Sequence, residues 1–256
     1  PMTKDYTLCL SSQAGCRAAC RFCLTGSLAL PARSLSAGEI VDQFRAAAQE
    51  LGDPYAITNL VFMGMGEPLF NYRNLRRAVE ILCGEHGRHF STRRITVSTA
   101  GVAPLIPRLG RDTSVNLAVS LNAANDALRD ELMPINRRWP LAVLKQALLD
   151  FPLPNRRRIT IEYVLLDGVN DAPAQAEEAV RFLAGLDVKV NVIPFNSYAG
   201  ARFTCPSEER IRAFGKVLYD ANIPVQLRER RGDEVRAACG QLGGDLLQAD
   251  EREFTP

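Results

Sequence analysis

The sequence predicts an α/β fold in which a six-stranded parallel sheet curls into a barrel or an open barrel. Short β-branched runs alternate with helix-like stretches, 46% of the 256 residues are apolar, and no low-complexity tract or shift in composition interrupts the chain. In such a sheet, right-handed crossovers bring the loops that follow the strands to one end, so functional residues are expected there. Residues 1–256 are interpreted as one domain.

The expected elements alternate along the whole chain. Six strands are predicted at residues 6–11, 59–62, 94–98, 115–121, 158–166 and 188–194. The first helix is predicted to open at Ser36, because its hydroxyl and the carboxylate of Glu39, three residues later, form a Ser-x-x-Glu capping box. Further helices are predicted at residues 75–82, 141–151, 174–186 and 207–221.

Composition narrows the functional classes. The chain has 31 Lys and Arg residues against 29 Asp and Glu residues, a net charge of +2, so contact with a nucleic acid would need local basic patches. No apolar run reaches the roughly 18 residues of a membrane span, and the first residues lack a signal-peptide pattern. We therefore expect a cytoplasmic protein with no membrane partner. Seven cysteines without a secretory signal indicate metal-binding or catalytic thiols rather than disulfides.

Three of the cysteines follow the first predicted strand with the spacing C-x3-C-x2-C: Cys16, Cys20 and Cys23. Thiolates are the ligands that hold iron–sulfur clusters, and three ligands on a four-iron cluster leave one iron open to another molecule. A structural zinc ion would need a fourth protein ligand, and none lies nearby in the sequence. Zinc with a distant ligand and buried cysteines without a metal remain as alternatives.

Polar residues also follow other predicted strands, where a ligand of a barrel would bind. Gly66 allows close backbone approach, and Glu67 offers an acceptor for the ammonium group of a ligand. Taken one at a time, such residues are more often turn formers or strand caps. The further residues of this kind are Ser98, Ser120 with Leu121 and Asn122, and Asn196.

The cysteine motif, with the aromatic Phe22 before its last cysteine, resembles the signature of the radical S-adenosylmethionine (SAM) superfamily. The stretch that contains Gly66 and Glu67 resembles the GEP-type SAM motif of that superfamily. The resemblance implies a partial (β/α)6 barrel, TIM-barrel-like, with a 4Fe-4S cluster on the three cysteines. It also implies SAM bound at the open iron by its amino and carboxylate groups. The implied SAM contacts are Gly66, Glu67, Ser98, Ser120, Leu121, Asn122 and Asn196.

Two more segments narrow the resemblance, one around Cys9 near the start and one around Cys239 near the end. They are similar to the paired motifs of the RlmN/Cfr family of RNA adenosine methyltransferases, and the match extends over essentially the whole chain. This resemblance implies methylation of adenosine in 23S rRNA, and possibly in tRNA, at carbon 2. The Cfr-type reaction at carbon 8 and a radical SAM reaction on a substrate other than RNA are the alternatives.

By the same resemblance, Cys239 takes a methyl group from a first SAM, and a second SAM is cleaved at the cluster to start radical transfer to the base. The RNA is then tethered to Cys239, and Cys9 attacks the sulfur to release it, which leaves a disulfide. An electron donor such as a flavodoxin or ferredoxin system is implied. A monomer is expected.

The chain departs from the family at two points. The family commonly has Ser-Leu-His where this chain has Ser120-Leu121-Asn122, and a small N-terminal accessory domain that helps to hold RNA has no counterpart in these 256 residues. A second cysteine–histidine group, Cys83, His86 and His89, could bind zinc but lacks a fourth ligand and is left unassigned. Cys205 is interpreted as structural.

Arginine clusters are the candidates for RNA contact, because guanidinium groups pair with phosphates and stack on unpaired bases. Only some are expected to touch RNA, since most surface arginines are simply solvated. The candidates are Arg73, Arg76, Arg77, Arg93, Arg94, Arg137 and Arg138 with Trp139, residues 156–158, Arg228, Arg230 and Arg231.

Overall fold

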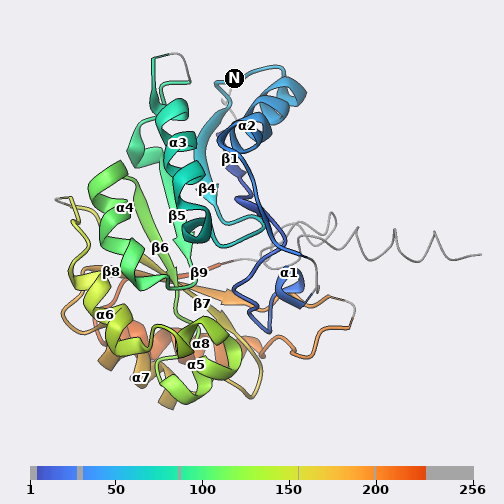
Figure 1. Cartoon of the computed structure of the whole chain (residues 1–256). Helices are drawn as coiled ribbons and strands as arrows, with labels where there is room; N and C mark the ends of the chain where they lie inside the picture. Colours follow the sequence, from blue (N-terminus) through green and yellow to red (C-terminus); the bar gives the residue numbers. More distant parts are fainter. Residues whose placement is uncertain (1–4, 28–30, 86–87, 155, 199, 229–256) are drawn as a thin grey trace, which may run out of the picture.

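A curled parallel sheet organises the molecule (Figure 1). The computed structural model describes residues 5–27, 31–85, 88–154, 156–198 and 200–228. The sheet has seven strands in the order β1-β4-β5-β6-β7-β8-β9, and every neighbouring pair is parallel. The predicted α/β, TIM-barrel-like fold is therefore confirmed. The strands are β1 (Tyr6–Cys9), β4 (Ile57–Phe62), β5 (Ile95–Thr99), β6 (Asn116–Ser120), β7 (Ile159–Leu165), β8 (Val188–Pro194) and β9 (Val225–Leu227).

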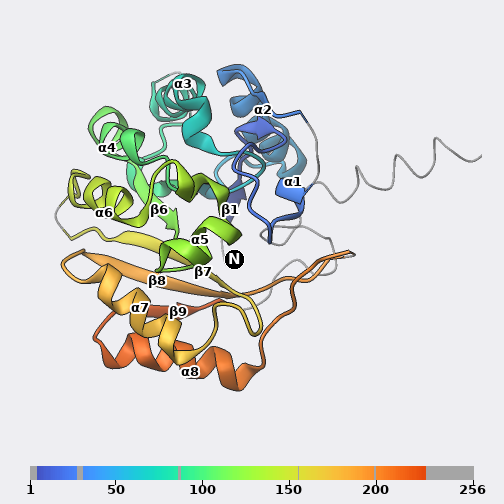
Figure 2. The same cartoon turned by 60° about the horizontal axis from the view of Figure 1, so that its bottom comes forward.

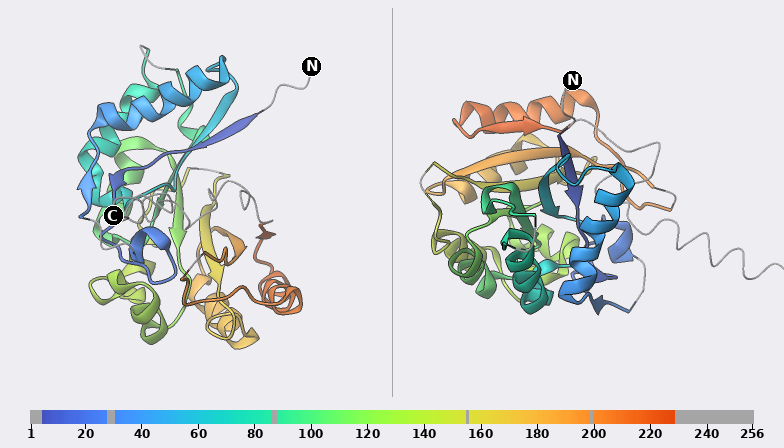
Figure 3. Two further views of the ribbon diagram at one scale, coloured as in Figure 1. Left: turned by 90° about the vertical axis from the view of Figure 1, so that its right-hand side faces the viewer. Right: turned by 90° about the horizontal axis from the view of Figure 1, so that it is seen from above.

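The six predicted strands correspond to β1 and β4 to β8, and the structure adds β9 at the edge of the sheet. A short antiparallel pair, β2 (Gln13–Ala14) with β3 (Arg33–Ser34), follows β1. These additions span only two or three residues each, too few to produce a periodic pattern in the sequence. Figure 3 shows the curled sheet from two further sides, with the sequence colours running in order across it.

Helices surround the outer face of the sheet as an arc (Figure 2). The helices are α1 (Leu24–Ser27), α2 (Ala37–Leu51), α3 (Tyr72–Cys83), α4 (Ile106–Thr113), α5 (Asp126–Leu132), α6 (Leu141–Leu149), α7 (Pro173–Leu183) and α8 (Glu208–Asp220). Single turns of 3-10 helix are η1 (Pro68–Asn71), η2 (Thr92–Arg94), η3 (Ala103–Leu105) and η4 (Pro134–Arg137). None of the helices in the described ranges is long and apolar enough to cross a membrane.

The predicted capping box is confirmed at the start of α2. The Ser36 hydroxyl accepts from the Glu39 amide at 3.2 Å, and the Glu39 carboxylate accepts from the Ser36 amide at 2.8 Å. Helices α4 and α5 were not predicted from the sequence. They have eight and seven residues, and α4 contains Pro107 and Gly110, which are poor helix formers.

The two faces of the sheet differ in chemistry because alternate residues of a strand point to opposite sides. On the outer face, apolar side chains pack under the helices in one continuous core, among them Leu60, Val97, Val119, Tyr163 and Val192. The inner face carries mainly polar residues. It includes Ser98, Ser120, Glu162 and Asn191, of which the last three are paired in register across β6, β7 and β8.

We expect Gly110→Ala to destabilise the protein by about 1–3 kcal/mol, because an added methyl group must displace a packed core. A Cβ atom at Gly110 would lie 2.7 Å from the Pro152 ring and 2.8 Å from the Phe151 ring. The matched control is Gly38→Ala on the exposed side of α2, where the nearest atom is 3.9 Å away. That variant should keep or raise stability by up to about 1 kcal/mol. Urea unfolding of both variants tests the packing, and equal stabilities would contradict it.

Candidate active site

A cavity of about 190 Å³ opens on the inner side of the sheet where the strands end. Its lining combines the three-cysteine loop with strand-end residues of β4 to β8, as expected for a barrel of this kind. Predicted site residues on the lining are Cys16, Cys20, Cys23, Gly66, Glu67, Ser98, Ser120 and Asn196. A larger hollow of about 440 Å³ lies on the outer side between α5, α6 and α7. It contains no cysteine and none of the strand-end residues, so the smaller cavity is the candidate site.

The cysteine loop is fixed to its neighbours through the backbone. The amides of Ser12 and Gln13 both donate to the carbonyl of Met65, at 2.9 and 3.1 Å, which ties the loop after β1 to the loop after β4. The amide of Arg21 donates to the carbonyl of Leu132 at 3.0 Å, which ties the loop to α5. The three thiols are thus held against the strand ends rather than on a free loop.

Burial controls the protonation of the thiols. It raises the pKa of Cys16 to about 11, and it raises the pKa of Cys20 still further. Repulsion from the charge of Cys23 adds to both shifts, so the three sulfur atoms lie close enough to influence one another. The thiolates of Cys16 and Cys20 therefore form readily only when a positively charged centre binds and releases their protons.

The thiol arrangement fits a cluster better than a single ion. A single zinc ion would bring its thiolate ligands to within about 4 Å of one another. In the part of the chain that the structure describes, no three His, Cys, Asp or Glu side chains are grouped closely enough to hold one metal ion. A four-iron cluster separates its ligands more widely, so the three cysteines of the cavity suit it. The group of Cys83, His86 and His89 stays unassigned, since His86 is outside the described residues.

The loop after β4 positions Gly66 and Glu67 at the cavity. Gly66 has a φ of 105°, and a Cβ atom there would lie 2.6 Å from the Cβ atom of Gln13, so only glycine fits. The Gln13 side chain in turn accepts from the Glu67 amide at 3.0 Å. This close approach brings the loop onto the cysteine loop.

The Glu67 carboxylate accepts hydrogen bonds from the backbone of two neighbouring loops. Its two oxygens accept from the amides of Leu69 at 3.0 Å and Ala100 at 2.7 Å, and the residue is 2% exposed. Burial raises its pKa to about 7. The side chain therefore links the loops after β4 and β5.

Asn196 carries a buried acceptor without a donor. Its side-chain oxygen has no hydrogen-bond partner among the described residues, and the residue lines the cavity. A buried polar atom of this kind is normally satisfied, so a ligand with a donor group suits it. Ser98 and Ser120 line the same cavity from β5 and β6.

Leu121 and Asn122 are not on the lining, although the sequence suggested SAM contacts for both. Leu121 is fully buried. Asn122 has a φ of 56°, and its side chain accepts from the Val164 amide at 2.8 Å and donates to the Met133 sulfur at 3.2 Å. This side chain joins the end of β6 to β7, a geometry that the sequence does not reveal because the left-handed backbone turns it.

Cys9 lies on β1 with its side chain exposed, paired in register with Val61 of β4. Val61 in turn pairs with Thr96, two residues from Ser98 on the same face of β5. Cys9 therefore shares the inner face with the cavity-lining serine. Cys239 lies outside the described residues, so its predicted pairing with Cys9 stays a prediction.

Glu162 is a cavity residue that the sequence did not indicate. It lies on β7, is 9% exposed, and accepts from the Asn191 amide group at 2.9 Å. Burial raises its pKa, while Asn191, Arg228 and Lys189 act in the opposite direction. The signal in the sequence was a single charged residue inside an apolar strand, which would have pointed to the inner face.

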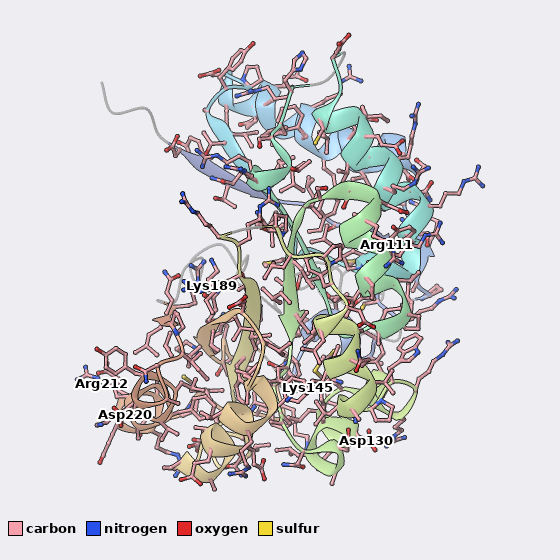
Figure 4. All side chains as sticks on the ribbon, turned by 90° about the vertical axis from the view of Figure 1, so that its left-hand side faces the viewer. Arg111, Asp130, Lys145, Lys189, Arg212 and Asp220 are labelled. Carbon is pink, nitrogen blue, oxygen red and sulfur yellow. The ribbon has the colours of Figure 1, made fainter. Side chains whose placement is uncertain are left out.

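The arginine candidates for RNA contact are spread over different sides of the molecule. Arg93 and Arg94 precede β5 and residues 156–158 precede β7, so they lie at the edge of the sheet opposite the cavity. Arg111 at the end of α4 and Lys189 at the start of β8 belong to the same edge (Figure 4). Arg228 instead follows β9 at the cavity edge, where its amide donates to the Val192 carbonyl at 2.9 Å. The remaining described candidates are Arg73, Arg76 and Arg77 on α3, and Arg137, Arg138 and Trp139 in and after η4.

We expect Glu162→Gln to make the protein more stable than the wild type at pH 8. Folding raises the pKa of this carboxyl above its ordinary value of 4.5, so the folded state binds the proton more tightly. The wild type therefore loses stability as the pH rises from 4.5 through the raised pKa, and the Gln variant does not. Thermal unfolding between pH 4 and pH 8 measures the difference, which should shrink toward the acid end.

The control for this prediction is Asp42→Asn on α2, whose carboxylate is exposed and pairs with Arg45 at 3.3 Å. Its stability should follow that of the wild type at every pH. A Glu162→Gln variant that is less stable than the wild type at pH 8 would mean that Arg228 and Lys189 outweigh the burial.

Known proteins resemble both the fold and the sequence. Residues 10–183 match the Radical SAM superfamily. Over 236 residues, 92% of this chain and 69% of the relative, the sequence is 54% identical to the "Dual-specificity RNA methyltransferase RlmN" of Syntrophobacter fumaroxidans. The protein of the same name from Anaeromyxobacter dehalogenans is 50% identical over 98% of this chain and 69% of its own length.

A solved structure agrees with these relatives. The crystal structure of a radical SAM methyltransferase from Sphaerobacter thermophilus superposes with a TM-score of 0.85 at 48% identity, covering 93% of this chain and 70% of that one. The family match covers most of the described barrel, and the two relatives extend it over nearly the whole chain. The chain belongs to the radical SAM superfamily and, within it, to the RlmN family.

Proposed function

We propose that this protein is a radical SAM RNA methyltransferase that methylates carbon 2 of adenosine in 23S rRNA and in tRNA. The observation that carries the proposal is the convergence of Cys16, Cys20 and Cys23 with the strand-end polar residues on one cavity. The relatives that share about half of its residues are named as dual-specificity RNA methyltransferases, which favours RNA over another substrate and RlmN-type over Cfr-type chemistry.

The cysteines would hold a 4Fe-4S cluster, with one iron left for SAM. When bound, the cluster would supply the electron that cleaves SAM and starts the radical reaction. Around it, the main-chain carbonyls at Gly66 and Glu67 would accept from the SAM amino group, and Asn196 would offer its free acceptor to a further donor. Ser98 and Ser120 would add hydroxyl contacts from the adjoining strands.

Two further cysteines would carry the methyl group and release the product. The Cys239 thiolate would attack the methyl carbon of SAM, so that a carbon–sulfur bond forms to Cys239 and S-adenosylhomocysteine leaves. This carbon would bond to the base after the radical reaction removes one of its hydrogens. The Cys9 thiolate would attack the Cys239 sulfur, so that a Cys9–Cys239 disulfide forms as the methylated RNA leaves. Cys9 suits this task because it lies on the inner face of β1 and is exposed. An external two-electron reductant then returns both thiols.

The open inner face of the sheet suits a large substrate. The edge strands β1 and β9 do not pair with each other in the described sheet, so the inner face is not closed off by a complete barrel. An adenosine that leaves its stack could enter from this side, and polar groups such as Glu162 and Asn191 would be available to its donors. A one-electron donor such as flavodoxin or ferredoxin would serve the cluster, and the protein would act as a monomer.

Replacing Cys16, Cys20 or Cys23 with Ala should abolish the brown iron–sulfur absorbance after anaerobic reconstitution, with iron and sulfide falling to background. Each substitution removes a ligand that the cluster cannot replace. Cys205→Ala is the matched control, since that thiol contacts the Pro206 carbonyl at 3.5 Å and is not on the cavity lining. Full cluster content in any of the three loop variants would refute the ligand assignment.

Cys9→Ala should accumulate protein covalently linked to RNA through Cys239, because the later attacking thiol is missing. Cys239→Ala should give neither a methylated protein nor an RNA adduct, since the methyl acceptor is lost. Denaturing gels with a labelled 23S rRNA fragment, and mass spectrometry of the RNA, distinguish the two. The wild type must first methylate the fragment. If the Cys9→Ala variant turns over without a crosslink, the resolving role is wrong.

A further inference from the structure

Arg129 on α5 is a charged side chain in the interior of the protein, with 0% of its surface exposed. Its guanidinium group donates to the carbonyls of Leu121 at 3.1 Å, Ala100 at 2.8 Å and Ser120 at 3.0 Å, and to the side-chain oxygen of Asn136 at 2.8 Å. All four acceptors are neutral. In the described ranges, no carboxylate oxygen lies within 4.0 Å of it.

A buried cation with only neutral partners is costly, because its charge has left water without gaining a counter-charge. Burial lowers the pKa of Arg129 to about 10, so the group still carries its charge at neutral pH. The nearby backbone leaves room for it. Gly101 has a φ of 116°, and a Cβ atom there would lie 3.2 Å from the guanidinium.

Three groups act against the effect of burial on the pKa of Arg129. Cys20 has the largest such effect, followed by Asp126 and Asp130. The two aspartates reach Arg129 only through Asn136, whose amide group donates to both carboxylates at 2.9 and 2.7 Å. On the other side, the amide of Arg21 in the cysteine loop donates to Leu132 at the end of α5.

The charge is also fixed in place by the walls of the site. Two of its carbonyl acceptors are on Ala100 and Ser120. Both of these residues line the cavity together with Cys16, Cys20 and Cys23. A neutral donor could satisfy some of these carbonyls, so hydrogen bonding alone does not account for a full charge here. A fixed cation bonded to two residues of the cavity lining acts on any charged centre that the cavity cysteines bind.

We propose that Arg129 is a positioning residue whose fixed positive charge raises the reduction potential of the iron–sulfur cluster held by Cys16, Cys20 and Cys23. This inference rests on the proposed function, because it needs the cluster. Reduction adds one negative charge to the cluster, and a buried cation stabilises the reduced form more than the oxidised form. Low dielectric around the guanidinium keeps this interaction strong.

The test is an EPR-monitored redox titration of reconstituted protein, with the cluster content of every sample measured as iron and sulfide. Arg129→Gln keeps donors but removes the charge, so the equilibrium constant for one-electron reduction should fall at least tenfold, a negative shift of about 59 mV. Arg129→Lys keeps the charge and should lie much nearer to the wild type. Equal reduction potentials in the wild type and both variants would contradict the inference and would mean that Arg129 has a purely structural role.

A second pair of variants, Asp130→Asn and Glu131→Gln, tests the same inference if Arg129→Gln fails to fold. Asp130→Asn removes an anion that offsets the Arg129 charge, yet keeps the oxygen that accepts from Asn136, so the potential should rise. Asp130 lies on α5 and is labelled in Figure 4. Glu131→Gln makes the same charge change on the next residue, which pairs with Arg202 at 3.5 Å, and should leave the potential unchanged.

Low ionic strength makes the Asp130→Asn shift easier to measure, since salt screens a partly exposed charge. A fall in potential for Asp130→Asn, or an equal rise for both carboxylate variants, would overturn the inference. A wild-type protein that takes up no cluster would instead overturn the proposed function, which the iron and sulfide analysis reveals before any potential is measured.

Discussion

The long helices in the described part of the chain pack on the outer face of the sheet, and the chemistry of the inner face follows from that constraint. The apolar core needs one side of each strand, which strand alternation supplies through residues such as Val97 and Tyr163. The opposite side then has no apolar layer to join, so it can carry serines, amides and the carboxylate of Glu162. A closed barrel would have to fill this space with packed side chains. In the open sheet, the apolar core on the outer face stabilises the fold, and the inner face remains available for ligands.

Backbone hydrogen bonds between loops convert this open sheet into a defined site. Gln13 contacts both the Met65 carbonyl and the Glu67 amide, and the Glu67 carboxylate continues the connection to Ala100. The guanidinium group of Arg129 on α5 then joins the ends of β5 and β6 by donating to the carbonyls of Ala100 and Ser120. Three successive strand ends are thus bound to one another through buried polar groups whose partners are all inside the protein. Such a network has few alternative arrangements, because each lost bond would leave a buried group unsatisfied.

The sequence predicted the fold well because its signals were local. β-branched runs gave six of the seven strands, and the Ser36 capping box placed the start of α2. The short helices α4 and α5 gave too few turns for a helical period, and Pro107 and Gly110 obscured α4 further. Strand β9, three residues long, depends on its pairing with β8 rather than on its own propensity.

Sequence reasoning points to candidate site residues where their spacing carries the chemistry, and it gives little where only the folded geometry does. The motif of Cys16, Cys20 and Cys23 can be read directly, because three thiols in one loop must converge. By contrast, Glu162 gave only one signal, a single charged residue within a strand that is largely buried. The roles of Glu67 and Asn122 depended on side-chain directions that a left-handed φ and two backbone donors determine. No pattern in the sequence predicts these side-chain directions.

The order of the strands has a consequence for how the protein is made. Except for the small β2–β3 pair, the strands lie across the sheet in the order in which they occur in the chain. Each new strand can therefore pair with the one synthesised just before it, and the sheet can grow from its N-terminal edge while translation continues. The loop with Cys16, Cys20 and Cys23 emerges in the first such step, whereas Glu162 and Asn196 arrive with the later strands. During biosynthesis the cysteine loop is thus in place before the far wall of its cavity, which is complete only when β8 joins the sheet.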